Sequence, residues 1–214
     1  MYSVKELFYS LQGEGAHAGR AAVFCRFTGC NLWSGREQDR AKAACDFCDT
    51  DFVGTDGELG AKYCHADALA AAVLKLWNSH CRDSRGSKPY VICTGGEPLL
   101  QLDSELIEAF QQQGFEVAVE TNGTLPAPPG LDWICVSPKG SAALQLTHGD
   151  ELKLVHPQAG IDPSQFSALQ FTHFYLQPLD GPEAAQSLAT CLDHCRQHPQ
   201  WRLSLQTHKL VNIP

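Results

Sequence analysis

Short runs of apolar, β-branched and aromatic residues alternate along the chain with longer stretches of helical periodicity. Strands that alternate with helices are typical of βα units around a mainly parallel sheet. The first predicted strand, Val4–Ser10, leads through the Gly-rich segment Gln12–Gly19 into the next. The later predicted strands are Ala21–Phe27, Pro89–Cys93, Glu116–Glu120, Trp133–Val136, Glu151–Val155, His173–Leu176 and Arg202–Gln206.

Only three connections have the length and periodicity of long helices: Ala66–Ser79, Ser104–Gln113 and Pro182–His198. Asp67 and Asp103 are the candidate N-caps of the first two. A complete eightfold barrel would need more helices than this. The pattern therefore predicts an α/β protein with a shortened, modified TIM-type βα barrel.

Length and charge narrow the possibilities. A chain of 214 residues with 43% hydrophobic content can bury one sizeable core, so residues 1–214 are expected to form one domain. No run reads as a secretory signal or approaches a membrane span, and a cytoplasmic protein is expected. The net charge of -8 argues against a nucleic-acid surface and favours a small-molecule partner. Arg40 and Lys42, the strongest basic pair, are interpreted as solvated surface.

The chain contains ten cysteines, which a reducing cytosol would keep from forming a disulfide framework. Cys25, Cys93 and Cys135 lie within apolar runs, where a thiol is usually a small buried hydrophobe. Cys191 and Cys195 are four residues apart in a helical pattern, so packing on one helix face is expected of them.

Cys45 and Cys48 form a Cys-x2-Cys pair, which is found in redox, zinc and iron–sulfur sites. Asp46 and Asp49 would oppose thiolate formation, so a thioredoxin-like redox site is disfavoured.

Cys30 adds a third thiol to the Cys45 and Cys48 pair. A structural zinc site would need a fourth ligand from Cys64 or His65. Three thiolates suit a [4Fe–4S] cluster instead, because the fourth iron is then free to bind another molecule. Both alternatives remain open on the cysteines alone.

The iron–sulfur alternative gains weight from Thr94-Gly95-Gly96-Glu97-Pro98, which follows a predicted strand and resembles the Gly-Gly-Glu element of radical S-adenosylmethionine (SAM) enzymes. Glycine permits a close backbone approach to a ligand. Those enzymes usually carry Cys-x3-Cys-x2-Cys, whereas fourteen residues separate Cys30 from Cys45 here.

Four longer motifs make the resemblance specific. The segments Leu7–Gly15, Phe24–Trp33, Cys45–Thr50 and His208–Pro214 resemble the 7-carboxy-7-deazaguanine synthase family, a carbon–nitrogen lyase, over nearly the whole chain. The resemblance implies a partial barrel of the radical SAM type, a homodimer, and conversion of 6-carboxy-5,6,7,8-tetrahydropterin to 7-carboxy-7-deazaguanine with loss of ammonia. This reaction provides the 7-deazapurine precursor of queuosine. A noncatalytic zinc scaffold and a glycyl-radical activase are the alternatives.

The same resemblance assigns site residues. Cys30, Cys45 and Cys48 are expected to hold the [4Fe–4S] cluster, and Thr50 a Mg²⁺ ion. The SAM-binding residues would be Phe47, Cys48, Asp49, Gly96, Ser137, Pro138, Lys139, Gln177, Pro178, Leu179 and Asp180. The pterin-binding residues would be Leu11, Gln12, Gly13, Glu14, Arg26, Thr94, His208 and Pro214, with Arg26 on the substrate carboxylate.

The polar segment Asn31–Ala44 lies between the first two cluster cysteines and reads as an inserted loop or short helix. It is expected to cover the cluster and to help select the electron donor, which the resemblance implies is of the flavodoxin type.

Overall fold

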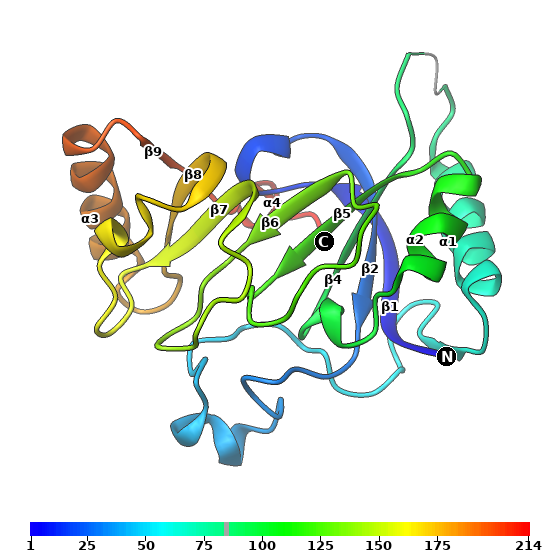
Figure 1. Cartoon of the computed structure of the whole chain (residues 1–214), viewed down its shortest axis with the longest axis horizontal. Helices are drawn as coiled ribbons and strands as arrows, with labels where there is room; N and C mark the ends of the chain where they lie inside the picture. The colour runs from blue at the N-terminus through cyan, green and yellow to red at the C-terminus, as the bar shows by residue number, and fades with distance from the viewer. Residues whose placement is uncertain (84–85) are drawn as a thin grey trace.

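The computed structural model describes residues 1–83 and 86–214, which contain one open, curved sheet of nine strands in the order β3-β1-β2-β4-β5-β6-β7-β8-β9 (Figure 1). From β2 to β9 all neighbours are parallel, whereas β1 pairs antiparallel with both β2 and β3. The strands are β1 Tyr2–Leu11, β2 Ala21–Phe27, β3 Ala61–Tyr63, β4 Tyr90–Gly95, β5 Glu116–Thr121, β6 Trp133–Val136, β7 His148–His156, β8 Gln170–Pro178 and β9 Trp201–Leu203.

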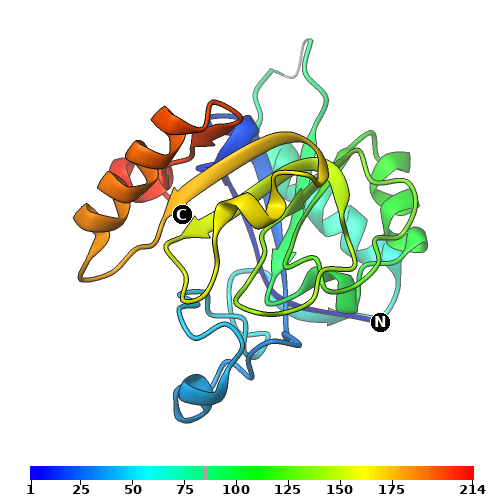
Figure 2. The same cartoon turned by 60° about the vertical axis from the view of Figure 1, so that its left-hand side comes forward.

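Helices cover the outer face of this sheet at its two ends. α1 (Ala66–His80) and α2 (Ser104–Gln112) lie side by side over one half, and α3 (Ala184–Gln197) packs on β8 and β9 (Figures 1 and 2). A short helix, α4 (Thr207–Val211), follows β9. The fold is the expected α/β partial barrel, with a sheet that does not close.

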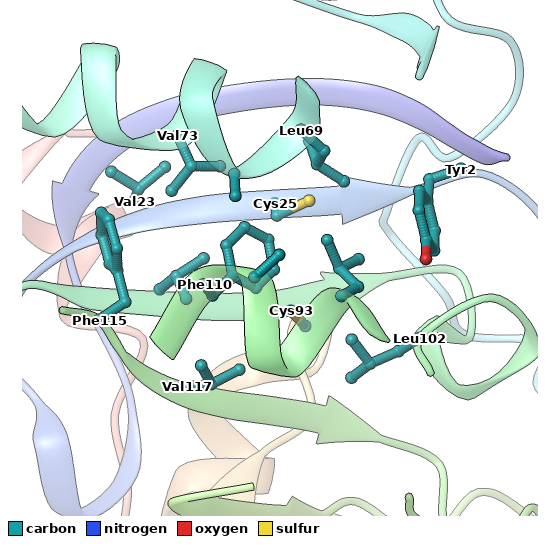
Figure 3. Packing of buried hydrophobic residues seen from close by; sticks show 14 of the residues in the cluster. Tyr2, Val23, Cys25, Leu69, Val73, Cys93, Leu102, Phe110, Phe115 and Val117 are labelled. Carbon is teal, nitrogen blue, oxygen red and sulfur yellow. The ribbon is translucent and has the colours of Figure 1, made fainter. Parts of the chain in front are cut away.

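The main core lies between α1, α2 and the first strands. Leu69 and Val73 of α1 and Phe110 of α2 meet Cys25 and Val117 of the sheet, all fully buried (Figure 3). Burying a large apolar side chain contributes roughly 1.5–3 kcal/mol, so this cluster fixes the helices on the sheet. Cys25, Cys93, Cys135 and Cys191 are buried and Cys195 is half-buried in apolar surroundings, as expected for packing cysteines.

Most predicted elements are confirmed within one to three residues of their ends. The last strand was expected at Arg202–Gln206 but ends at Leu203, because the chain then leaves the sheet and Thr207 bonds to the Gly13 carbonyl. The three-residue β3 and the five-residue α4 are too short to give a periodic signal. No helix in the described ranges is long and apolar enough to cross a bilayer.

The two candidate N-caps behave differently. The Asp103 carboxylate accepts the Leu106 N–H at 3.0 Å and so caps α2. The prediction for Asp67 is wrong, because His65 occupies the N-cap of α1 and Asp67 lies exposed in the first turn. An aspartate inside the helix has its own helical backbone and no longer reaches the free N–H groups.

These positions give a matched pair of variants. We expect Asp103→Ala to lower the free energy of unfolding by about 1–2 kcal/mol, since it removes the cap and the hydrogen bond from the Tyr2 hydroxyl. Asp67→Ala should cost only a few tenths of a kcal/mol, roughly the charge–dipole contribution. Urea unfolding followed by circular dichroism measures both. Equal losses in the two variants would contradict the assignment of the cap.

Candidate functional site

Two cavities of about 380 and 390 Å³ adjoin on the inner side of the sheet, where the parallel strands end. We call them the Arg26 cavity and the Cys48 cavity after one lining residue of each. They share a wall, so a molecule in one would face a molecule in the other. The shared wall consists of Glu14, Asp49, Thr50, Thr94, Glu120 and Gln206.

The Arg26 cavity collects residues from both ends of the sequence. Every residue expected to bind the pterin lines it, although these residues come from β1, β2, β4 and the C-terminal segment. They are Leu11, Gln12, Gly13, Glu14, Arg26, Thr94, His208 and Pro214. The structure thus brings the whole predicted group together.

Three contacts bring the C-terminal segment to this cavity. Thr207 donates to the Gly13 carbonyl through its backbone N–H and its hydroxyl, at 2.9 and 2.8 Å. The Ser10 hydroxyl donates to the Pro214 carbonyl at 2.7 Å. A Cβ on Gly13 would overlap the His208 ring, so glycine is required where the two segments meet.

Arg26 points one side of its guanidinium at a protein carboxylate. Its Nε donates to Glu6 at 2.7 Å, and the guanidinium carbon lies 5.6 Å from the centre of the Phe8 ring. Among the described residues, nothing accepts a hydrogen bond from its two terminal nitrogens. Arg26 is therefore oriented and still has two parallel donors for a carboxylate, a bidentate arrangement.

The Cys48 cavity is lined by all but one of the residues expected to bind SAM. The exception is Pro138, which is buried and whose carbonyl accepts from the Gln158 side chain at 3.2 Å. The lining residues are Phe47, Cys48, Asp49, Gly96, Ser137, Lys139, Gln177, Pro178, Leu179 and Asp180.

The three cluster cysteines lie next to one another at one end of this cavity. Cys45 and Cys48 line it, while Cys30 lies behind Gly96, where an added Cβ would come 2.9 Å from the Cys30 Cβ. A hydrogen bond from the Cys45 thiol lowers the pKa of Cys48 below its ordinary value. The Leu32 N–H donates to the Cys30 sulfur at 3.4 Å. Adjacent, hydrogen-bonded thiols of this kind suit an iron–sulfur cluster.

The zinc alternative lacks its fourth ligand in this structure. Cys64 is exposed, at the end of β3. Within residues 1–83 and 86–214, no three Cys, His, Asp or Glu side chains are arranged to hold a single metal ion. A zinc site closed by Cys64 is therefore not formed in the part of the chain that the structure describes.

Glu97 fixes the loops at the mouth of the sheet. It is completely buried, and its carboxylate accepts from the Thr121 hydroxyl and the Asn122 N–H at 2.7 and 2.8 Å. Its own N–H donates to the Gly29 carbonyl at 2.8 Å. Through its carboxylate and its backbone N–H, this one residue joins the loops after β2, β4 and β5 and holds Gly96 beside Cys30.

Arg40 does not lie free in solvent, so that expectation is wrong, although Lys42 is exposed. The insertion forms a short 3-10 helix, Glu37–Lys42, which protrudes at the lower edge of the molecule in Figures 1 and 2. Arg40 lies 4.2 Å over the Trp33 ring and donates to the carbonyls of Asp46 and Cys48 at 2.8 and 3.0 Å. The insertion folds back onto the cysteine loop, which its sequence does not reveal.

Sequence reasoning also missed a buried ionic group. Lys153 lies 2.8 Å from Glu14 and 2.9 Å from Glu120, two of the three acids of the shared wall. A signal existed, because Glu151 and Lys153 are charged residues on one face of a strand and alternate along it with Leu152 and Leu154.

Arg40 can be tested on the protein without cofactors. Replacing Arg40 by Met removes two charge-assisted hydrogen bonds to the cysteine loop, so we expect Cys48 to be alkylated by iodoacetamide at least about tenfold faster. Peptide mass spectrometry gives the rate for each cysteine. Arg36→Met, an exposed change in the same insertion, should leave the rate unchanged. An alkylation rate of Cys48 that is unchanged in Arg40→Met would contradict the proposal that Arg40 holds the cysteine loop in place.

Comparison with known proteins agrees with this geometry. No family model matches the chain. The chain is 62% identical to a protein of Bordetella pertussis named 7-carboxy-7-deazaguanine synthase, covering 100% of this chain and 99% of that protein. A protein of the same name from Bradyrhizobium diazoefficiens is 61% identical over 99% of both. The crystal structure of QueE from Escherichia coli has the same fold, with a TM-score of 0.68 at 24% identity, covering 97% of this chain and 94% of that one. The chain belongs to the 7-carboxy-7-deazaguanine synthase family.

Proposed function

We propose that this chain is a radical SAM enzyme that converts 6-carboxy-5,6,7,8-tetrahydropterin to 7-carboxy-7-deazaguanine with release of ammonia, in 7-deazapurine and queuosine-precursor biosynthesis. The observation that carries the proposal is the shared wall between the Arg26 and Cys48 cavities. Bringing two reactants face to face is the main contribution a protein makes to such chemistry.

The cluster and SAM would occupy the Cys48 cavity. Cys30, Cys45 and Cys48 would hold the [4Fe–4S] cluster, and Gly96 leaves the backbone accessible beside it. When bound, the cluster and SAM supply a one-electron cleavage that yields a radical able to remove a hydrogen atom. The side chains that would position SAM are themselves held in place. The Lys139 ammonium group donates to the Ser137 hydroxyl at 2.8 Å, and the Lys209 ammonium group donates to Asp49 and Asp180.

The pterin would occupy the Arg26 cavity. The two free nitrogens of Arg26 would bind its carboxylate, with Glu6 holding the guanidinium in that orientation. Gln12 and the backbone of Gly13 offer donors and acceptors for the ring edge. His208 and Pro214 close the cavity from the C-terminal side.

Thr50 lies in the shared wall beside Asp49, and we assign the Mg²⁺ site to Thr50. Hydroxyl, carboxylate and carbonyl oxygens are the ligands that Mg²⁺ prefers, usually together with waters and substrate oxygens. At this position the ion would touch molecules in both cavities.

We propose a cytoplasmic homodimer that receives electrons from a flavodoxin-type protein, with the 3-10 helix of the insertion over the cluster taking part in donor selection. The net charge of -8 supports a small-molecule substrate over a nucleic acid. The size of the Arg26 cavity, about 380 Å³, suits a small molecule and favours the synthase over a glycyl-radical activase, which would act on a large protein.

Anaerobic reconstitution tests the proposed reaction. Wild-type protein is loaded with iron and sulfide and incubated with SAM, reductant, Mg²⁺ and the carboxytetrahydropterin. We expect 7-carboxy-7-deazaguanine and ammonia, detected by mass spectrometry, with SAM regenerated. A SAM-responsive cluster that forms no deazapurine would contradict the synthase.

Cysteine variants separate the cluster from the zinc alternative. Cys48→Ala should lose the visible absorption of the cluster, whereas Cys64→Ala, a change at an exposed cysteine, should keep both cluster and turnover. Tight zinc binding that is lost in Cys64→Ala, without cluster assembly, would favour the zinc scaffold.

A further inference from the structure

Lys153 of β7 is a buried ammonium group between two cavities. Its side chain is 5% exposed, whereas those of Glu14 and Glu120 are 17% and 20% exposed. Both carboxylates line the two cavities, and Lys153 lines only the Cys48 cavity. The lysine is thus the least exposed of the three groups, and the acids face the space of both cavities.

Each carboxylate is held from a second side by amide groups. Glu120 accepts from the Gln12 side chain at 3.1 Å. Glu14 accepts from the side chains of Gln177 and Gln206, both at 3.0 Å. Because these partners come from separate strands and loops, the orientation of both carboxylates is fixed before any ligand arrives.

The charges of this group do not balance. One ammonium serves two carboxylates, and the third nearby acid, Glu151, has its pKa raised by burial. Burial alone would raise the pKa of Glu14 as well, but the charge of Lys153 and its hydrogen bond lower it to about 2. Glu14 therefore presents a negative charge to the shared wall at neutral pH.

A role in fold stability alone explains the exposure and the partners of Lys153, Glu14 and Glu120 less well. A buried pair that only supports the fold has its charged atoms enclosed and adds little stability over apolar side chains. Here all three side chains line the Cys48 cavity, and the two carboxylates also line the Arg26 cavity and are more exposed than the lysine.

We propose that Lys153 is a positioning residue for the proposed reaction: it holds Glu14 and Glu120 in fixed orientations as hydrogen-bond acceptors in the shared wall, which selects a substrate edge rich in N–H donors. This inference rests on the proposed function and adds how the site chooses its substrate. An ionised carboxylate accepts hydrogen bonds only. An amino-pyrimidine edge with adjacent N–H groups satisfies it, whereas an edge of acceptors leaves a buried charge unpaired.

Two substitutions in the reconstituted holoenzyme test this role. Lys153→Met removes the charge and keeps the chain length, and Lys153→Arg keeps the charge. We expect Lys153→Met to raise the substrate KM about tenfold or more at neutral pH, and Lys153→Arg to keep it near the wild-type value.

The pH profile gives a readout that a structural role would not produce. Without Lys153 the pKa of Glu14 rises, so Glu14 becomes protonated at a higher pH and substrate binding is lost earlier as the pH falls. We expect the acid limb of kcat/KM to move up by at least about one pH unit in Lys153→Met. Lys153→Arg should keep the wild-type acid limb.

A triple variant covers the case in which Lys153→Met does not fold. Combining it with Glu14→Gln and Glu120→Gln leaves no unpaired buried charge, so the protein should fold again. Its substrate KM should match that of the Glu14→Gln/Glu120→Gln double variant, because Lys153 would have nothing left to act through. A triple variant that binds substrate like the wild type would overturn the proposal.

A folded Lys153→Met enzyme with wild-type KM and pH profile would also overturn it. If the wild-type holoenzyme does not turn over the pterin, the proposed function fails and this role fails with it. Active wild type with an unchanged Lys153→Met variant contradicts the role of Lys153 alone.

Discussion

Parallel pairing from β2 to β9 is the constraint on which the rest of the structure depends. Neighbouring parallel strands end at the same edge of the sheet. The sheet therefore places residues that are far apart in sequence close together, even where their side chains do not contact one another. Arg26 of β2 is paired in register with Thr94 of β4, and Val155 of β7 with Gln177 of β8. Both cavities lie where these strands end. The antiparallel β1 adds the Gln12–Glu14 turn, which the C-terminal segment then meets at Gly13.

Buried polar groups fix the positions of the loops and side chains of the site, but their burial lowers the stability of the fold. Glu97 binds three loops from a fully buried position, and Lys153 holds two acids that face ligand space. Each such group loses its hydration, and hydrogen bonds must compensate for that loss. An apolar replacement would serve packing equally well, so these groups are better explained by the positions they fix than by the stability they add.

The sequence predicts the strands, the long helices and most lining residues, for different reasons. Strand and helix periodicity follow from burial on one or both faces, which local sequence records. The site residues are predicted from motifs shared with a family. These motifs assign Arg26 and His208 to one site, although the local sequence does not show that the two residues lie close together. The contacts of Arg40 and Lys153 escape prediction because they depend on how a loop folds back and on which distant acids face one strand. Pro138 departs from the expected lining because its loop turns it into the interior.

We propose that the two adjoining cavities hold SAM and the pterin on either side of Glu14, Thr50 and Glu120. A crystal structure of the reconstituted enzyme with both molecules bound would show where each one lies. We expect SAM in the Cys48 cavity, the pterin carboxylate on Arg26, and the reacting carbons about 3–3.5 Å apart at the shared wall. A pterin bound outside the Arg26 cavity, or both molecules within one cavity, would contradict this proposal.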